Sequence, residues 1–354
     1  MRNFKTYLII NELNEQFLQS ICLEEAAELK DGYKKASPDT KGKLHELLVG
    51  YHLMGGNHMS KHSDIVGDSP KQAHDKLKET VHPDEYAKIN ERAKSAAEDI
   101  RHHVTKGGHS ISDVHWTSKA GDLKRSTGID ASQKEDASDI VVHTKNAKSD
   151  KTKFHGVSLK VTDSASKHVP ISNPGMESTH GAHTILEEHR RHLLTKFPAI
   201  STMTNKDQRK EHMRQNPKMA EYVKQKNKET KEKIADHLHK TLLLMDHDEL
   251  VHHIKHHVLH AEMTPMERSG HTHIRHTTST VGGEKNPRYA HHTIVPSKHH
   301  EHIFKDADNI KVVRSGATVH FHYKGKSFAS HAIKFSSESD PMSGIKGSGN
   351  SSGD

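Results

Sequence analysis

The chain of 354 residues has almost no cysteine and no long apolar run. Cys22 is its one cysteine, so no disulfide can form within the chain, and zinc sites built from several thiolates are excluded. Cys22 also lies among acidic residues, which disfavours a nucleophilic thiolate. No apolar stretch approaches the length that spans a bilayer, and Leu8 to Ile10 is too short for the apolar core of a signal peptide. These absences predict a protein of a reducing, intracellular compartment that is not inserted in a membrane.

Several motifs of common enzyme classes are missing as well. The chain has no GxxxxGK[ST] and no GxGxxG, which disfavours nucleotide-driven and dinucleotide chemistry. It has no GxSxG, the turn that carries the nucleophile of many serine hydrolases. It also has no HExxH, because Val49 stands where a second histidine would follow His45 and Glu46.

What the chain does have is charge and histidine. Hydrophobic residues make up 31% and aromatic residues 5% of the sequence, which predicts a modest core with solvated helices or loops around it. Lysine and arginine number 53 against 46 acidic residues, and the net charge of +7 suits a polyanionic partner. The 37 histidines would make the protein far more cationic near pH 6.

Hydrophobic periodicity alternates between helical and strand-like stretches along the chain. The helical patterns cover 39–54, 69–103 and 180–260. The strand-like patterns cover 111–116, 139–144, 155–162 and 270–335. This order predicts an α/β (α+β) fold with a mixed sheet flanked by helices. The composition further divides the chain into five segments. They are a helical leader (1–38), a core (39–200) with a helical insertion at 69–105, a charged helical segment (201–262), a basic β-rich region (263–340) and a disordered Gly/Ser-rich tail (341–354).

A predicted hairpin gathers groups that suit a metal and a phosphate. Asp139 opens the β-branched strand that runs through Val142, and Ser158 and Lys160 share one face of the next strand. If the two strands pair antiparallel, Asp139 lies beside them, and its carboxylate is a hard oxygen ligand for Mg²⁺ or Mn²⁺. Glu46, in an otherwise apolar stretch of a helix, would supply a second carboxylate.

The order of Glu46, Asp139 and Lys160 resembles the PD-(D/E)XK nuclease superfamily, over roughly residues 40–175. The resemblance implies a restriction-endonuclease-like core, divalent-metal-dependent phosphodiester hydrolysis and DNA as the usual substrate. Ser138 stands in place of the family's proline, and Ser158 replaces the acid of (D/E)-x-Lys. The Leu159 carbonyl and water would then complete the metal ligands, or another carboxylate would move in; the candidates are Asp130, Asp136, Asp163 and Glu177. In a further alternative, the site has decayed and only binds.

Basic and polar residues around the hairpin predict contacts with the DNA backbone. The expected contact residues are Lys119, Lys124, Arg125, Lys134, Lys167, His168, Asn173 and Arg275. The first eight residues also resemble the short leaders of tailed-phage capsid-targeted proteins. Association with a phage capsid, a place in the virion rather than the cytoplasm, and a homodimer therefore stay open.

Three alternatives to a PD-(D/E)XK nuclease remain at this point. The first is a non-catalytic DNA-binding or virion protein that keeps a decayed nuclease fold. The second is a ββα-metal nuclease, although its His/Asn/His arrangement cannot be assembled from this sequence. The third is a histidine-rich metal-binding protein, because pairs such as His252 and His256, or His271 and His273, have spacings that can chelate zinc or nickel.

Overall fold

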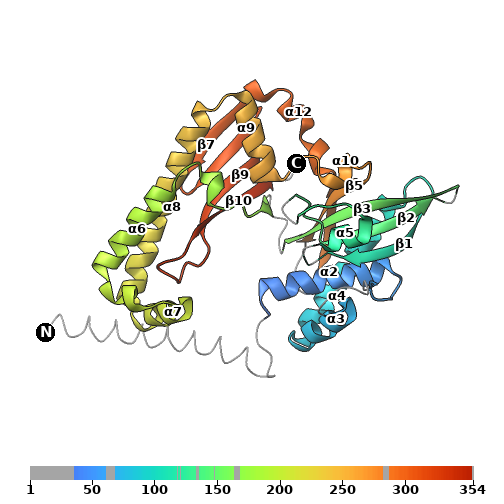
Figure 1. The fold of residues 1–354 in the computed structure, drawn as a ribbon, viewed down its shortest axis with the longest axis horizontal. Coiled ribbons are helices and arrows are strands. Elements are labelled where there is room, and N and C mark those ends of the chain that lie inside the picture. The colour runs from blue at the N-terminus through green and yellow to red at the C-terminus, as the bar shows by residue number, and fades with distance from the viewer. Residues whose placement is uncertain are drawn as a thin grey trace. The chain divides into compact units, whose positions relative to one another are not determined.

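A computed structural model describes residues 36–60, 68–117, 119, 121–132, 135–146, 148–162, 168–281 and 287–352 (Figure 1). The predicted leader, 1–38, falls almost entirely outside these residues, as do Lys134, Asp163 and Lys167. The chain divides into two compact units, Met1–Leu159 and Lys160–Asp354. The segment 39–200, predicted as one core, is therefore split between Leu159 and Lys160.

The first unit pairs a small helical layer with three antiparallel strands. Its elements are α2 (Pro38–Leu53), α3 (Pro70–Glu79), α4 (Pro83–Val104), β1 (His109–Trp116), α5 (Asp122–Thr127), β2 (Ile140–Asn146) and β3 (Ser149–Thr162). The Ser37 side chain accepts the amide of Thr40 and so caps α2, with Pro38 in the first turn. Alanines on the buried face of α4, Ala93 and Ala97 among them, let α2 pack closely against it.

The three strands form a meander in which β2 lies between β1 and β3. Val142 faces Val114 on β1 and His155 on β3. Ile140, Val141 and Val142 are fully buried, as expected for a central strand covered on both faces. The predicted antiparallel hairpin is therefore present. β2 lies close to the expected 139–144, and β3 ends at the expected Thr162 but begins earlier than expected, at Ser149 rather than His155.

The second unit is built on a five-stranded antiparallel sheet in the order β4-β10-β9-β8-β7. Its elements are β4 (His168–Ser172), η1 (Met176–Thr179), α6 (His183–Lys196), η2 (Pro198–Thr202), α7 (Lys206–Gln215), α8 (Pro217–Leu244), α9 (His247–His253), the π-helix η3 (Ile254–Leu259), α10 (Pro265–Arg268), β5 (Thr272–Val281), β6 (Arg288–Ile294), α11 (Pro296–His299), α12 (Glu301–Phe304), η4 (Ala307–Asn309), β7 (Ile310–Ser315), β8 (Thr318–Tyr323), β9 (Lys326–Phe335) and β10 (Ile345–Ser352). The strands β5 and β6 form an antiparallel hairpin.

Helices cover the five-stranded sheet. The long helix α8 contacts β7, β8 and β9, and α6 packs beside α8 (Figure 1). The core between α8, the π-helix and the sheet contains Leu238, Ile254, Val319 and Phe321, each essentially inaccessible to solvent. The stretch over 180–260, predicted to be helical, is divided into several helices; one break falls at Asn216, between α7 and Pro217, which begins α8.

The prediction of a disordered tail over 341–354 is wrong, because β10 occupies Ile345–Ser352 and pairs with β9 and β4. Its glycines permit close packing rather than disorder. A Cβ at Gly349 would collide with the carbonyl of Val258 in the π-helix, and one at Gly347 would collide with the imidazole of His331. The Gly/Ser composition of β10 is therefore what lets this strand lie directly beneath η3.

The predicted fold class is confirmed: the protein mixes helices and sheets, with helices against the sheets and a β-rich C-terminal part. Within the described ranges, no helix is both long enough and apolar enough to cross a membrane.

Candidate active site

Glu46 is held in place by the only tryptophan of the chain. It lies on α2 between the buried residues His45 and Leu47 and is itself half-buried. Its Oε2 accepts a hydrogen bond of 2.9 Å from Nε1 of Trp116, the last residue of β1. A charge-assisted bond of this kind fixes the direction of the carboxylate.

Asp139 immediately precedes β2 and forms hydrogen bonds with the chain segments on both sides of that strand. Its amide donates to the carbonyl of Val157 at 2.9 Å, and its carbonyl accepts the amide of Thr117 at 3.1 Å. Its Oδ2 accepts the amide of Leu159 at 2.6 Å. The Asp139 carboxylate is thus anchored to the backbone of β3, beside the residues that the sequence predicted as its neighbours.

These contacts bring Glu46 and Asp139 to the same end of the meander. Trp116 holds Glu46, and the next residue, Thr117, bonds to the backbone of Asp139. The helix acid and the strand acid, which lie far apart in the sequence, are therefore attached to adjacent residues at the end of β1.

Ser158, which stands where the superfamily has an acid, is 3% exposed. A carboxylate at such a depth would require a compensating charge, whereas a hydroxyl group does not. The neighbours Val157 and Leu159 are buried too, so both faces of β3 are covered here and Ser158 lies inside the protein.

Lys160 lies two residues beyond Ser158 on β3 and is half-exposed. It is the first residue of the second unit, where its charge acts on His260. Burial, followed by the positive charges of Arg275 and Lys160, lowers the pKa of His260 to about 4.

The missing acid is not supplied by the described candidates. Among the described residues, two groups of three histidine or carboxylate ligand atoms lie within 4.8 Å of one another, and neither contains Glu46 or Asp139. Asp136 is buried and accepts the amide and the hydroxyl of Ser138, while Asp130 pairs with Lys124 at 2.6 Å. Glu177 lies in the second unit.

The donor set of Glu46 and Asp139 nevertheless suits Mg²⁺. This ion prefers hard oxygen ligands, keeps several of its waters, and is commonly held by one or two carboxylates. Both carboxylates are half-buried and oriented by hydrogen bonds, and the Leu159 carbonyl that was predicted to assist them belongs to the residue whose amide binds Asp139.

The residues predicted to contact DNA lie in different environments. Lys119 and Lys124 are exposed beside α5, and Arg125 there bonds to Asp122 at 2.6 Å. Asn173 is exposed after β4, and His168 lies on β4.

Arg275 is a correction, since its side chain is not at a surface. It is 6% exposed and its Nη2 donates to the carbonyl of Leu259, and burial lowers its pKa to about 10. A basic, strand-like sequence around it gave no indication of this burial.

A basic groove in the second unit was not predicted from the sequence. It has a volume of about 1240 Å³ and lies along α7, α8 and the loop after β9. Six cationic side chains line it against two glutamates; the cations are Lys210, Arg214, Lys218, Lys224, Lys228 and Lys231. The sequence predicted only a charged helical segment over 201–262, and the loop that completes the groove is distant in the sequence.

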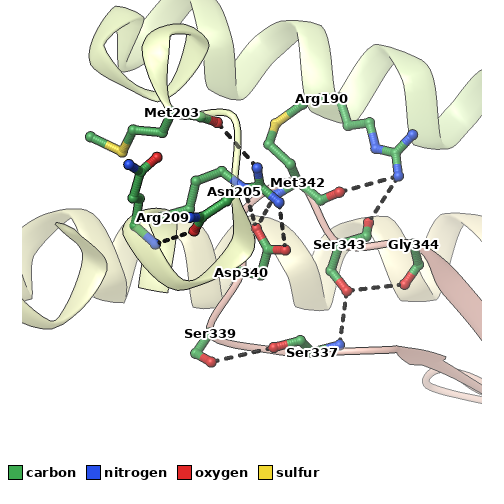
Figure 2. Close-up of polar contacts among 11 residues, drawn as sticks. Arg190, Met203, Asn205, Arg209, Ser337, Ser339, Asp340, Met342, Ser343 and Gly344 are labelled. Carbon is green, nitrogen blue, oxygen red and sulfur yellow. Dashed lines mark hydrogen bonds and ion pairs between the residues drawn. The ribbon is translucent and has the colours of Figure 1, made fainter. Parts of the chain in front are cut away.

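The loop that borders this groove is pinned by two arginines (Figure 2). Arg209 on α7 binds both oxygens of Asp340, at 2.7 and 3.0 Å, and Arg190 on α6 donates to the carbonyls of Met342 and Ser343. Burial alone would raise the pKa of Asp340, but hydrogen bonds from Arg209 and from the amide of Met342 lower it. The wall of the groove is therefore a rigid loop.

Beneath the π-helix, the second unit buries a chain of hydrogen-bonded histidines. His180 Nε2 lies 2.9 Å from His253 Nδ1, and His253 Nε2 lies 3.4 Å from His331 Nδ1. Burial is the largest cause that lowers the pKa of each; that of His331 falls to about 3 and that of His253 falls well below its usual value. The lowered pKa values favour the neutral imidazole, in which one ring nitrogen donates and the other accepts, as suits a chain of N–H···N bonds.

Comparison with known proteins assigns no family, because no protein-family model, curated protein or solved structure matches this chain.

Proposed function

We propose that the protein is a metal-dependent nuclease that hydrolyses phosphodiester bonds of DNA. The observation that carries this proposal is the anchoring of Glu46 and Asp139 at one end of the β1–β3 meander, by the Trp116 indole and the Leu159 amide. Two oriented carboxylates next to a strand that continues to Lys160 are the groups that phosphodiester hydrolysis needs.

Each residue has a distinct part in this reaction. Glu46 and Asp139 would hold Mg²⁺ or Mn²⁺, and such an ion would supply positive charge for the phosphate and lower the pKa of water. The ammonium group of Lys160 orients the attacking water and offsets the negative charge that develops on the phosphate. Ser158 contributes at most a hydrogen bond, because it is uncharged and buried.

The basic groove favours a second candidate function, DNA binding without hydrolysis. Its six cations could bind successive phosphates whether or not the carboxylates hold a metal. Ser158 also stands where the nuclease superfamily has an acid. The groove and this serine together suit a protein that has kept a nuclease fold, binds DNA and no longer hydrolyses it. In both candidate functions the partner is DNA, and the protein acts in the cytoplasm or in a virion.

The test is cleavage of supercoiled and linear DNA with Mg²⁺ or Mn²⁺. Asp139→Asn keeps an oxygen that accepts the Leu159 amide but removes the charge, and Lys160→Ala removes the ammonium group. We expect each variant to lose cleavage by more than about 100-fold, on the scale of removing a group that stabilises the transition state. Asp84→Asn on α4 and Lys151→Ala on β3, both at exposed positions, are the matched controls.

Three outcomes separate the candidates. Loss in both site variants, with both controls active, supports the nuclease. Cleavage that is equal in all the proteins overturns the assignment of these residues. Salt-dependent DNA binding by a wild-type protein that does not cleave with either metal overturns the nuclease and supports the second candidate.

A further inference from the structure

Three potential metal ligands meet on the surface of the second unit, near the end of α9. They are Nδ1 of His252, Nδ1 of His256 and the carboxylate of Glu262. His252 Nδ1 lies 3.2 Å from Glu262 Oε1, and His256 Nδ1 lies 2.9 Å from Oε2. Each carboxylate oxygen thus faces one imidazole nitrogen.

The helix and the turn that ends it create this arrangement. His252 and His256 are four residues apart, so they share one helix face, and their rings stack with centroids 5.3 Å apart and planes 17° apart. The π-helix ends at His260, a non-glycine residue in the left-handed region with φ of 44°. Ala261 then donates to the carbonyl of Lys255 at 2.8 Å, and the chain turns back so that Glu262 lies beside both histidines.

The spacing of the three ligands suits a tetrahedral ion. Zinc bonds to nitrogen and oxygen are about 2.0–2.1 Å long, which puts two ligand atoms of a tetrahedron about 3.3 Å apart. The two nitrogen–oxygen distances, 3.2 and 2.9 Å, are close to that value but run to different oxygens of Glu262. One ligand atom from each residue lies within 4.8 Å of the other two, so a small rotation of the exposed carboxylate would bring a single oxygen beside both nitrogens. Two imidazoles and a carboxylate also match the borderline ligand preference of zinc and its first-row neighbours, and not that of Mg²⁺ or Ca²⁺.

We propose that His252, His256 and Glu262 bind a divalent ion of the zinc class, with water in the fourth position. The ion ties the chain that leaves the π-helix back onto the last turn of α9. It thereby stabilises the end of η3, where the Leu259 carbonyl receives the buried guanidinium of Arg275. This site is independent of the proposed nuclease activity, whose metal would have oxygen ligands only.

The other described cluster, His58, His74 and Asp75 in the first unit, is less suited to an ion. Both ring nitrogens of His74 already have protein partners, since Nδ1 faces Asp75 at 3.1 Å and Nε2 faces the hydroxyl of Tyr86 at 3.0 Å. An ion bound at Nε2 would displace the hydroxyl of Tyr86 from this buried histidine.

Cobalt provides the test, because tetrahedral Co²⁺ gives intense visible absorption bands that octahedral or loosely bound Co²⁺ does not. The full chain, without an added histidine tag, is titrated with Co²⁺ and then with Zn²⁺. We expect one equivalent of Co²⁺ to produce the tetrahedral bands and Zn²⁺ to remove them. Glu262→Ala and His256→Ala should each lose these bands.

The matched control is His247→Ala. His247 is another exposed histidine that pairs with a carboxylate, since its Nδ1 lies 3.1 Å from Asp308, but it belongs to neither of the three-ligand groups found among the described residues. The bands should persist in this variant, and circular dichroism should show all variants folded. No tetrahedral bands in the wild type, or bands of equal intensity in all variants, would overturn the proposal.

Discussion

The two units differ in how their charged side chains are held. In the first unit, the carboxylates of Glu46 and Asp139 are half-buried, and each accepts a hydrogen bond from a rigid N–H donor. In the second unit, the lysines of the groove extend into solvent from α7 and α8, while the histidines beneath the π-helix are buried and neutral. The first unit therefore fixes the direction of these two charges, whereas the groove of the second unit provides a density of positive charge.

This difference separates two kinds of function. Chemistry on a phosphate requires groups held within a fraction of an ångström, which fixed hydrogen bonds provide. Binding to a polyanion requires a density of positive charge and tolerates flexible side chains, because it depends largely on the release of counterions. The comparison predicts that single changes in the first unit affect rates, whereas changes in the groove affect salt-dependent affinity.

The largest expected effect comes from protonating the buried histidines of the second unit. The pKa of His331 is about 3 in the folded state, below the usual value of 6.5 that applies when the chain is unfolded. Its neutral form is therefore favoured by folding. The resulting stability is complete above about pH 6.5 and is lost as the pH falls from there towards about 3, by roughly 5 kcal/mol in all.

Urea unfolding of wild type and His331→Gln between pH 8 and pH 4 measures this loss. The variant should be less stable at pH 8 and its stability should depend less on pH. Identical slopes for the two proteins would contradict the assignment to His331.

Breaking the Arg209–Asp340 pair comes next. Asp340→Ala leaves Arg209, whose side chain is 15% exposed, without its buried partner, and should lower the free energy of unfolding by about 3 kcal/mol. Glu229→Ala, which breaks the more accessible Lys226–Glu229 pair of 2.7 Å, is the control and should lower the free energy of unfolding far less. Similar losses for the two variants in urea unfolding would show that the loop beside the groove is not pinned by this contact.

Trp116→Phe tests whether the first unit depends on the direction of its charges. Phenylalanine keeps an aromatic ring at the end of β1 but removes the N–H that Glu46 accepts. If the protein is a nuclease, kcat/KM for DNA cleavage should fall about tenfold, which corresponds to about 1.4 kcal/mol. The Mg²⁺ concentration for half-maximal rate should rise as well. An unchanged rate and metal requirement would mean that this hydrogen bond does not position Glu46.

The smallest effect is expected in the groove. Replacing Lys224 and Lys228 with alanine removes two cations from its lining. The slope of log K against log salt for DNA binding should become shallower by about 1.8, with only a severalfold loss of affinity at moderate salt. Replacing Lys311 and Lys326, exposed lysines on the strands β7 and β9, is the control. Equal changes in slope for the two pairs would show that the groove is not the binding surface.

Local pattern was enough to predict the hairpin around the candidate site. The β-branched run after Asp139 and the alternation through Ser158 marked two strands, and the structure pairs them with Asp139 bonded to Leu159. The same alternation could not reveal that Ser158 is buried, since that depends on what covers the second face of β3. Arg275 was misplaced for the same reason.

The sequence by itself determined the features that arise within a few residues. These are the helix caps, the strand alternation, and the four-residue spacing that puts His252 and His256 on one helix face. Only the tertiary structure decided that Trp116 holds Glu46, that Glu262 joins the two histidines, and that Gly349 belongs to a buried strand. The physical reason is range: backbone hydrogen bonds and side-chain periodicity act along a short stretch of chain. Contacts between distant residues instead depend on which faces the whole chain can bury together without collision.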